Sequence, residues 1–158
     1  MSEALSPAAQ RVQEMLRAAG SEAQVRQLPM TARTAADAAA AIGCAVAQIA
    51  KSLVFKTRSG KPVLVIASGV NRVDETKIAA ALGEPIGKAD ARFVRGMTGY
   101  TIGGVAPIGH ETPPRIFIDQ DLRQHRVLWA AAGHPHAVFP LTAEELEHLT
   151  RGTVIEVK

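Results

Sequence analysis

The amino-acid sequence predicts a single mixed α/β (α+β) domain in which helices flank a central mixed sheet. The chain has 158 residues, within the ~100–200 of a typical domain, and its 47% hydrophobic content can fill a core. Two β-branched apolar runs, 51–57 and 62–68, are joined by a short turn and read as a hairpin. Helical and extended segments follow one another without regular strand–helix–strand alternation, which favours a mixed architecture.

The expected elements follow local start and stop signals. Ser6 and Pro7 stand where a helix N-cap and first residue belong, and Gly20 ends the amphipathic pattern. Thr142 and Glu145 occupy capping-box positions near the C-terminus. The expected helices cover residues 7–19, 34–43, 46–50, 73–83, 89–97 and 141–149. The expected strands cover residues 25–29, 51–57, 62–68, 115–119, 126–133 and 152–157.

The strand expected at 51–57 begins with a lysine. Both hairpin strands are almost continuously apolar, which predicts a central sheet buried on both faces. A charge at the start of such a strand is costly unless it has a partner. Lys51 is therefore either a strand-edge cation that extends to solvent or a cation directed at an anionic or carbonyl group in a cleft.

Residues 101–110, TIGGVAPIGH, suit neither a helix nor a strand. Glycine allows a positive φ and lets a ligand approach the backbone closely, whereas proline fixes φ and removes a donor. A segment that contains both is a shaped loop. It is either a turn between core elements or part of a binding site.

The sequence offers no activated nucleophile and no metal motif. Ser52 and Ser68 lack an elbow motif, and Cys44 lies in an apolar segment where we expect a small buried residue. As the only cysteine, Cys44 can form neither an intramolecular disulfide nor a cysteine zinc cluster. His134 and His136 would bind a metal only with a third ligand from elsewhere. Metal catalysis is therefore the weaker interpretation.

Charge and hydropathy limit the partners. A net charge of +3 allows a local contact with a polyanion but is far from the dense basic stripe of a duplex binder. The N-terminus lacks the basic and apolar regions of a signal peptide, and no run approaches the ~18 apolar residues of a membrane span. The sequence predicts a soluble, cytoplasmic protein without membrane contact, and a monomer.

Five segments follow one another along the chain: IAKSLVFK, PVLVIASGVNRVDETKIAAALG, GGVAPIGH, IFIDQDL and AAAGHPHAVFPLTAEELEHL. The most specific element is Lys51 after a short helix, followed about fifty residues later by a GxxxP loop at 103–107. In this order the segments resemble the YbaK/prolyl-tRNA editing family of aminoacyl-tRNA deacylases. The resemblance extends from about residue 26 to residue 158, within a single domain over 1–158.

The resemblance implies a curved central sheet, no cofactor, and hydrolysis of the ester that joins a wrong amino acid to the 3′ end of a tRNA, often tRNA for proline. The chain carries no synthetase parts, so it resembles a freestanding enzyme that acts in trans. The 2′-hydroxyl of the terminal adenosine is expected to position or activate the water, which would make a catalytic triad unnecessary. One methylene changes binding by only ~1–3 kcal/mol, which is why synthetases confuse small amino acids. The amino acid expected to be removed is therefore a small one: Ala, Ser, Cys, Thr or 2-aminobutyrate.

The family pattern also assigns residue roles. The loop N–H groups would hold the ester carbonyl or the amino acid, and Lys51 would bind the phosphate or hydroxyls of the terminal nucleotide or orient the ester. His110 would reach the same cleft or cap a turn. The GHPH residues at 133–136 depart from the GGK-like loops of some members, which leaves the choice of amino acid open. The implied catalytic residues are Lys51, Gly103 and Gly104, and the implied substrate-binding residues are Val105, Ala106, Pro107, His110, Gly133 and His134.

The expected partner is the acceptor end of an aminoacyl-tRNA, and prolyl-tRNA synthetase is a further candidate. An alternative is a non-catalytic module of the same fold that binds tRNA or a nucleotide. A metal-dependent hydrolase that uses the histidines is a third interpretation. The lysine and the complete GxxxP loop favour the enzyme.

Overall fold

The computed structural model describes residues 5–30, 32 and 34–158. Its helices are α1 (Pro7–Ala18), α2 (Ala35–Ile42), α3 (Glu75–Leu82), α4 (Ala91–Thr98) and α5 (Ala143–Thr150), with short 3₁₀ segments η1 (Val46–Gln48) and η2 (Gln120–Gln124). Its strands are β1 (Arg26–Gln27), β2 (Ile49–Thr57), β3 (Pro62–Ser68), β4 (Ile86–Lys88), β5 (Arg115–Asp119), β6 (Leu128–Ala131), β7 (Ala137–Leu141) and β8 (Thr153–Ile155).

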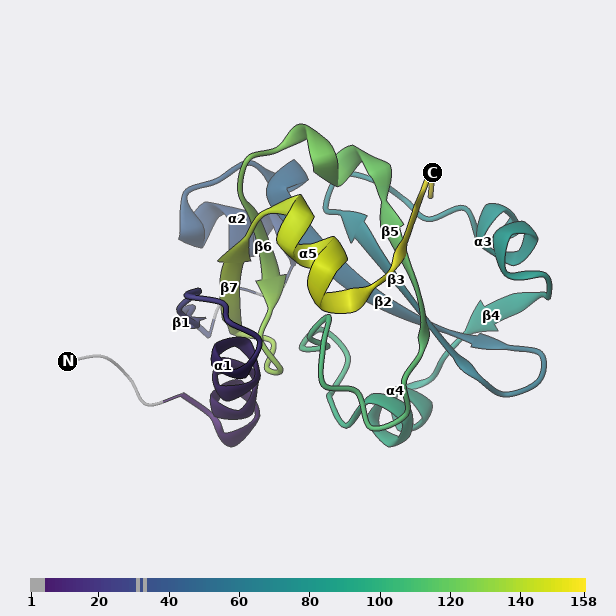
Figure 1. Ribbon diagram of the computed structural model, residues 1–158, viewed down its shortest axis with the longest axis horizontal. Helices are drawn as coiled ribbons and strands as arrows, with labels where there is room; N and C mark the ends of the chain where they lie inside the picture. The colour runs from purple at the N-terminus through teal and green to yellow at the C-terminus, as the bar shows by residue number, and fades with distance from the viewer. Residues whose placement is uncertain (1–4, 31, 33) are drawn as a thin grey trace.

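In the described part of the chain, the eight strands form one mixed sheet in the order β1-β7-β6-β2-β3-β5-β8, and β4 also pairs with β2. The β2–β3 pair is antiparallel, whereas β2–β6, β3–β5 and β5–β8 are parallel. Figure 1 shows α3 and α4 near β4 at one end of the molecule and α1 and α2 at the other. The mixed α/β prediction is confirmed.

The predicted caps hold the helices in place. The Ser6 side chain accepts from the N–H of Ala9 at the start of α1, and the Asp74 side chain accepts from the N–H of Thr76 at the start of α3. Thr142 and Glu145 form the expected capping box of α5. Such caps satisfy donors that the first helical turn leaves without partners. Local sequence signals therefore locate the helix starts.

The two hairpin strands differ in burial. Every residue of β3 is buried, as predicted for a strand covered on both faces. The same prediction is wrong for β2, because Lys51 to Phe55 are only half-buried. Cys44 is also half-buried rather than buried, because it follows Gly43 in the turn that ends α2.

Alternate residues of β3 divide the core between the two faces of the sheet. Leu64 and Ile66 belong to the larger cluster, which also contains Val94 and Val105. Val65 and its alternate neighbours belong to a second cluster with α3. This alternation follows from the two-residue period of a strand. It also shows which face of β2 each of its side chains occupies, since paired residues share a face.

None of the helices in the described residues has the length and apolar character needed to cross a bilayer. The absence of a signal peptide was predicted from the first ten residues. Residues 1–4 lie outside the described part of the chain. Cytoplasmic location and a monomeric state stay predictions.

Candidate active site

The middle of β2 has an open edge. On the side away from β3, β2 pairs with β6 only at Ile49 and Ala50, and with β4 only from Phe55 onward. The carbonyl of Ile49 accepts from Gly69 N–H at 2.8 Å, so the odd-numbered residues of β2 direct their backbone groups toward β3. The N–H and C=O groups of Ser52 therefore point to the open edge, between the residues that pair with β6 and those that pair with β4.

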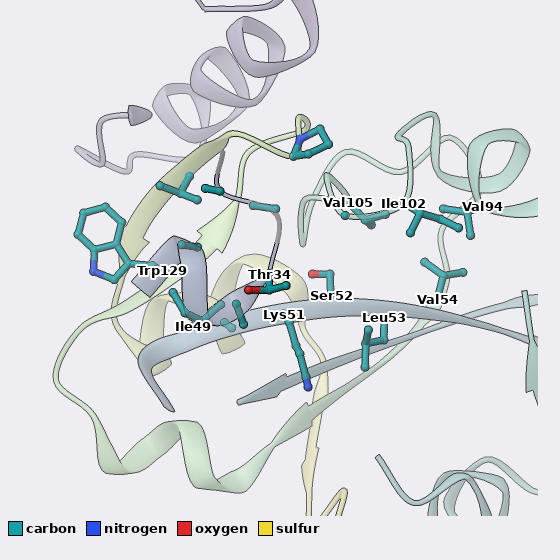
Figure 2. Close-up of a pocket in the computed structure, with 18 of the residues that line it drawn as sticks. Thr34, Ile49, Lys51, Ser52, Leu53, Val54, Val94, Ile102, Val105 and Trp129 are labelled. Carbon is teal, nitrogen blue, oxygen red and sulfur yellow. The ribbon is translucent and has the colours of Figure 1, made fainter. Parts of the chain in front are cut away.

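A groove with a cavity volume of about 430 Å³ runs along this edge. All seven residues from Ile49 to Phe55 line it, a length of about 20 Å at ~3.3 Å per residue. Both odd- and even-numbered residues of β2 line the groove, because the groove lies at the edge of the strand and touches both faces of the sheet. Its other walls come from α2, the β4–α4 segment, the glycine loop, β6 and the β6–β7 loop, with lining residues that include Thr34, Val94, Ile102, Trp129 and Pro135 (Figure 2).

Ser52 is the polar side chain that points toward the loop. It pairs with Ile66, so it extends to the same face as the larger core cluster, and Figure 2 shows it directed toward the side on which Val105 lies. Its Oγ is buried and has no hydrogen-bond partner among the described residues. A buried hydroxyl without a partner costs free energy, so this position is suited to a polar group of a ligand. Sequence reasoning considered Ser52 only as a nucleophile and did not predict its position in the groove.

The glycine loop contributes two of its predicted residues to the groove. Gly103 and Val105 line it, and neither N–H has a partner among the described residues. The Gly104 N–H donates instead to the carbonyl of Thr101 at 3.0 Å, so it closes a turn. Gly103 has a φ of +87°, a conformation that favours glycine. The loop therefore offers two free N–H donors, those of Gly103 and Val105, and the Gly104 N–H between them is already hydrogen-bonded.

Gly104 and His134 are neighbours in space. A Cβ added to Gly104 would lie 2.8 Å from the carbonyl carbon of His134 and 2.9 Å from the nitrogen of Pro135. This contact places Pro135, rather than His134, on the groove wall. The Nδ1 atom of His134 accepts from the N–H of His136, and the described residues contain no group of three potential metal ligands. The predicted roles of Gly133 and His134 in shaping the pocket stay predictions.

Ala106, Pro107 and His110 lie away from this groove. Ala106 is fully buried, and its carbonyl accepts from His110 Nε2–H at 2.7 Å. The His110 ring stands edge-on to Tyr100 with centroids 6.0 Å apart, and burial lowers the pKa of His110 below its ordinary value. Pro107 and His110 line a separate hollow. The structure thus shows His110 holding the loop, and a contact of these three residues with substrate stays a prediction.

Lys51 lines the groove from the other face of β2. It pairs with Ala67, which belongs to the second core cluster, and Figure 2 shows its amine extending away from the side of Ser52 and Val105. Burial lowers the pKa of the Lys51 ammonium, and the carboxylate of Asp119 opposes that shift. Asp119 is buried and accepts from the Ser68 N–H and the Asn71 amide. Lys51 and the glycine loop thus border one groove from opposite faces.

Comparison with known proteins shows the family. Residues 30–149 match the model of the aminoacyl-tRNA editing domain. The chain belongs to that family. It is 44% identical to a solved structure described as a candidate trans-editing enzyme for prolyl-tRNA synthetase, with a TM-score of 0.93 over 98% of this chain and 99% of the other.

Other relatives of this editing domain include freestanding proteins and a synthetase. YwhH of Bacillus subtilis is 29% identical over 129 residues, which are 82% of each chain. EbsC of Enterococcus faecalis, named as a candidate deacylase of Cys-tRNA(Pro) and Cys-tRNA(Cys), is 26% identical over 78% of this chain and 76% of its own. A proline–tRNA ligase of Brachyspira hyodysenteriae is 36% identical over 46% of this chain, but this match covers only 13% of the ligase.

The described lining of the editing-domain groove contains no carboxylate, imidazole or thiol. Its charged members are Lys51 and Lys88. The polar groups that can meet an ester include the Ser52 hydroxyl, backbone groups of β2 and the N–H groups of Gly103 and Val105. Lys88 was not singled out from the sequence, because β4 is too short to show a strand pattern.

Proposed function

We propose that this protein is a freestanding trans-editing hydrolase that removes a small wrong amino acid from tRNA, with tRNA for proline as the leading substrate. The observation that carries the proposal is the groove at the open edge of β2, which combines an apolar lining with unpartnered hydrogen-bonding groups. Membership of the aminoacyl-tRNA editing family and the relatives named for prolyl-tRNA and Cys-tRNA(Pro) support this substrate class.

The chemistry needs only one bond to be exchanged for another. A water oxygen forms a bond to the ester carbonyl carbon, the bond from that carbon to the ribose O3′ breaks, and O3′ gains a proton. The products are a free amino acid and a tRNA with its 3′-hydroxyl restored. Because the described lining offers no carboxylate or imidazole as a general base, the adenosine 2′-hydroxyl is the group we propose to position or activate the water.

The protein then contributes placement and charge stabilisation. The N–H groups of Gly103 and Val105, or of Ser52 on the opposite side, can donate to the carbonyl oxygen as it becomes negative. One such donor is worth ~2.7–4 kcal/mol of barrier in other acyl-transfer enzymes. The carbonyls at the β2 edge can accept from the α-amino group. Lys51 would bind the phosphate or hydroxyls of the terminal nucleotide from the other face.

Deacylation of a panel of tRNA(Pro) charged with Pro, Ala, Ser, Cys, Thr or 2-aminobutyrate tests this function. We expect rapid loss of one or two small wrong amino acids, with Pro-tRNA(Pro) spared. Binding of every charged tRNA without hydrolysis of any would instead support the alternative, a module that holds tRNA without catalysis.

A further inference from the structure

The described lining residues at the two ends of the groove differ in charge. At one end the lining residues are uncharged and include Ile49, Trp129 and Val138, although the guanidinium of the exposed Arg26 lies over Trp129 beside them. At the other end the groove meets β4 and α4, and its lining includes Lys88 and Ala89. Val94 of α4 lines the same end (Figure 2). An elongated groove with one cationic end can orient a linear polyanion, because phosphates are drawn to that end.

Lys88 shares a face with Lys51. It pairs with Phe55, and Lys51, Leu53 and Phe55 alternate along one face of β2. Phe55 is four steps along the strand from Lys51, a distance of about 13 Å at ~3.3 Å per residue. The two charged residues of the lining, Lys51 and Lys88, thus lie in a row along the open edge of β2. Lys88 is the nearer of the two to the β4–α4 end of the groove.

More cations continue beyond the groove at this end. Lys56 is exposed, and its Nζ lies 5.1 Å from the ring centre of Phe93 on α4. Arg92 is exposed on α4. None of Lys56, Lys88 and Arg92 forms a salt bridge with a described residue. The nearby carboxylate of Asp90 accepts from the N–H of Phe93 as the cap of α4.

We propose that the 3′ strand of the RNA leaves the groove at the β4–α4 end and that Lys88 binds its phosphates, with Arg92 next along the path. The inference rests on the proposed function and adds the direction in which the RNA strand leaves the groove. The terminal ester lies between Ser52 and Gly103, and the backbone of the preceding nucleotides passes Lys88. Ile102, which is 57% exposed and lines the groove near Val94, offers an apolar contact to a base.

The test compares a substrate with phosphates and one without them. Deacylation is measured with a mischarged tRNA and with the matching aminoacyl-adenosine, which carries no phosphate, for the wild type, Lys88→Gln, Arg92→Gln, their double variant and Arg26→Gln. Arg17→Gln removes an exposed charge from α1, away from the groove, and is the matched control. Salt is varied for each protein.

We expect KM for the tRNA to rise in the Lys88 and Arg92 variants while kcat holds. The slope of log KM against log salt should fall by about 0.7 for each phosphate contact to a single strand that is lost. Activity toward the aminoacyl-adenosine should equal that of the wild type. Hydrolysis of neither substrate by the wild type would contradict the proposed function itself.

Three results would overturn the inferred direction while the function stands. The first is an unchanged KM and salt slope in the double variant. The second is an equal loss on both substrates, since a phosphate contact cannot matter for aminoacyl-adenosine. The third is a KM effect confined to Arg26→Gln, because Arg26 lies over Trp129 at the other end, with 5.2 Å between its guanidinium carbon and the ring centre.

Discussion

Gly104 packs directly on the backbone of His134. The 2.8 Å that would separate a Gly104 Cβ from the His134 carbonyl carbon is shorter than real Cβ contacts, and the atoms it meets are backbone atoms that cannot rotate away. The glycine loop and the β6–β7 loop are thus joined at the one position where only a hydrogen atom fits. This contact sets the wall of the groove opposite β2.

Gly104→Ala should separate the two loops. We expect the free energy of unfolding to fall by ~1–3 kcal/mol, as for other overpacked sites, and deacylation to fall with it. Gly87→Ala is the matched control, because nothing lies within 4 Å of the position of its Cβ and its φ is not positive. Urea unfolding of both variants checks this, and equal losses would contradict the packing argument.

Ser52→Ala should separate stability from activity. Because the buried Ser52 Oγ lacks a partner, its removal should leave the free energy of unfolding unchanged or raise it by up to ~1 kcal/mol. If the hydroxyl meets the substrate, kcat/KM should fall by about 10²-fold. Ser68→Ala is the control, since Ser68 Oγ donates to the Ala47 carbonyl at 2.8 Å, and it should lower stability with little effect on activity. Wild-type turnover by Ser52→Ala would remove Ser52 from the site.

His110 should make stability depend on pH. Burial lowers its pKa in the folded protein, so the unfolded chain takes up the proton first as the pH falls. The stability contribution of neutral His110 is complete above its ordinary pKa of about 6.5 and is lost as the pH falls through its lower folded pKa. His110→Gln keeps a donor for the Ala106 carbonyl. Thermal melts between pH 8 and about pH 5 should show a smaller loss of Tm for this variant, and parallel curves would contradict the assignment.

Lys51→Ala should cut deacylation strongly, by about 10²-fold, while the fold survives. The exposed Lys61 in the β2–β3 turn provides the control Lys61→Ala, which should retain wild-type kinetics. The comparison requires kcat/KM together with a thermal melt, because Lys51 also faces the buried carboxylate of Asp119. A stable Lys51→Ala variant with full turnover would show that Lys51 only interacts with the Asp119 carboxylate and takes no part in deacylation.

Local signals predicted much of this fold, and non-local pairing explains the rest. Caps at Ser6, Asp74 and Thr142 and the β2–β3 hairpin could be predicted because their signals lie within a few residues. β7 was missed because Pro140 lowers the strand signal, although β1 pairs only with Ala137 and Val138 and leaves this proline unopposed on that side. β4 is a strand of three residues without a pattern of its own.

The site was predictable in outline only. Lys51 and the glycine loop were singled out from the residues and given roles by the family resemblance, and the structure brings Lys51, Gly103 and Val105 to one groove. The open edge between Ala50 and Phe55 depends on where β4 and β6 pair with β2, which no local pattern records. For that reason the sequence predicted a fully buried β2 and overlooked Ser52 and Lys88 as groove residues.

The most direct measurement of the central claim is single-turnover deacylation of a mischarged tRNA(Pro) that ends in normal adenosine or in 2′-deoxyadenosine. The account predicts rapid release of a small wrong amino acid from the normal tRNA, and a rate close to spontaneous hydrolysis from the deoxy form. Equal rapid rates would show that the protein supplies its own base and contradict substrate assistance. No acceleration of either substrate, across the amino-acid panel, would contradict the assignment of this groove to deacylation.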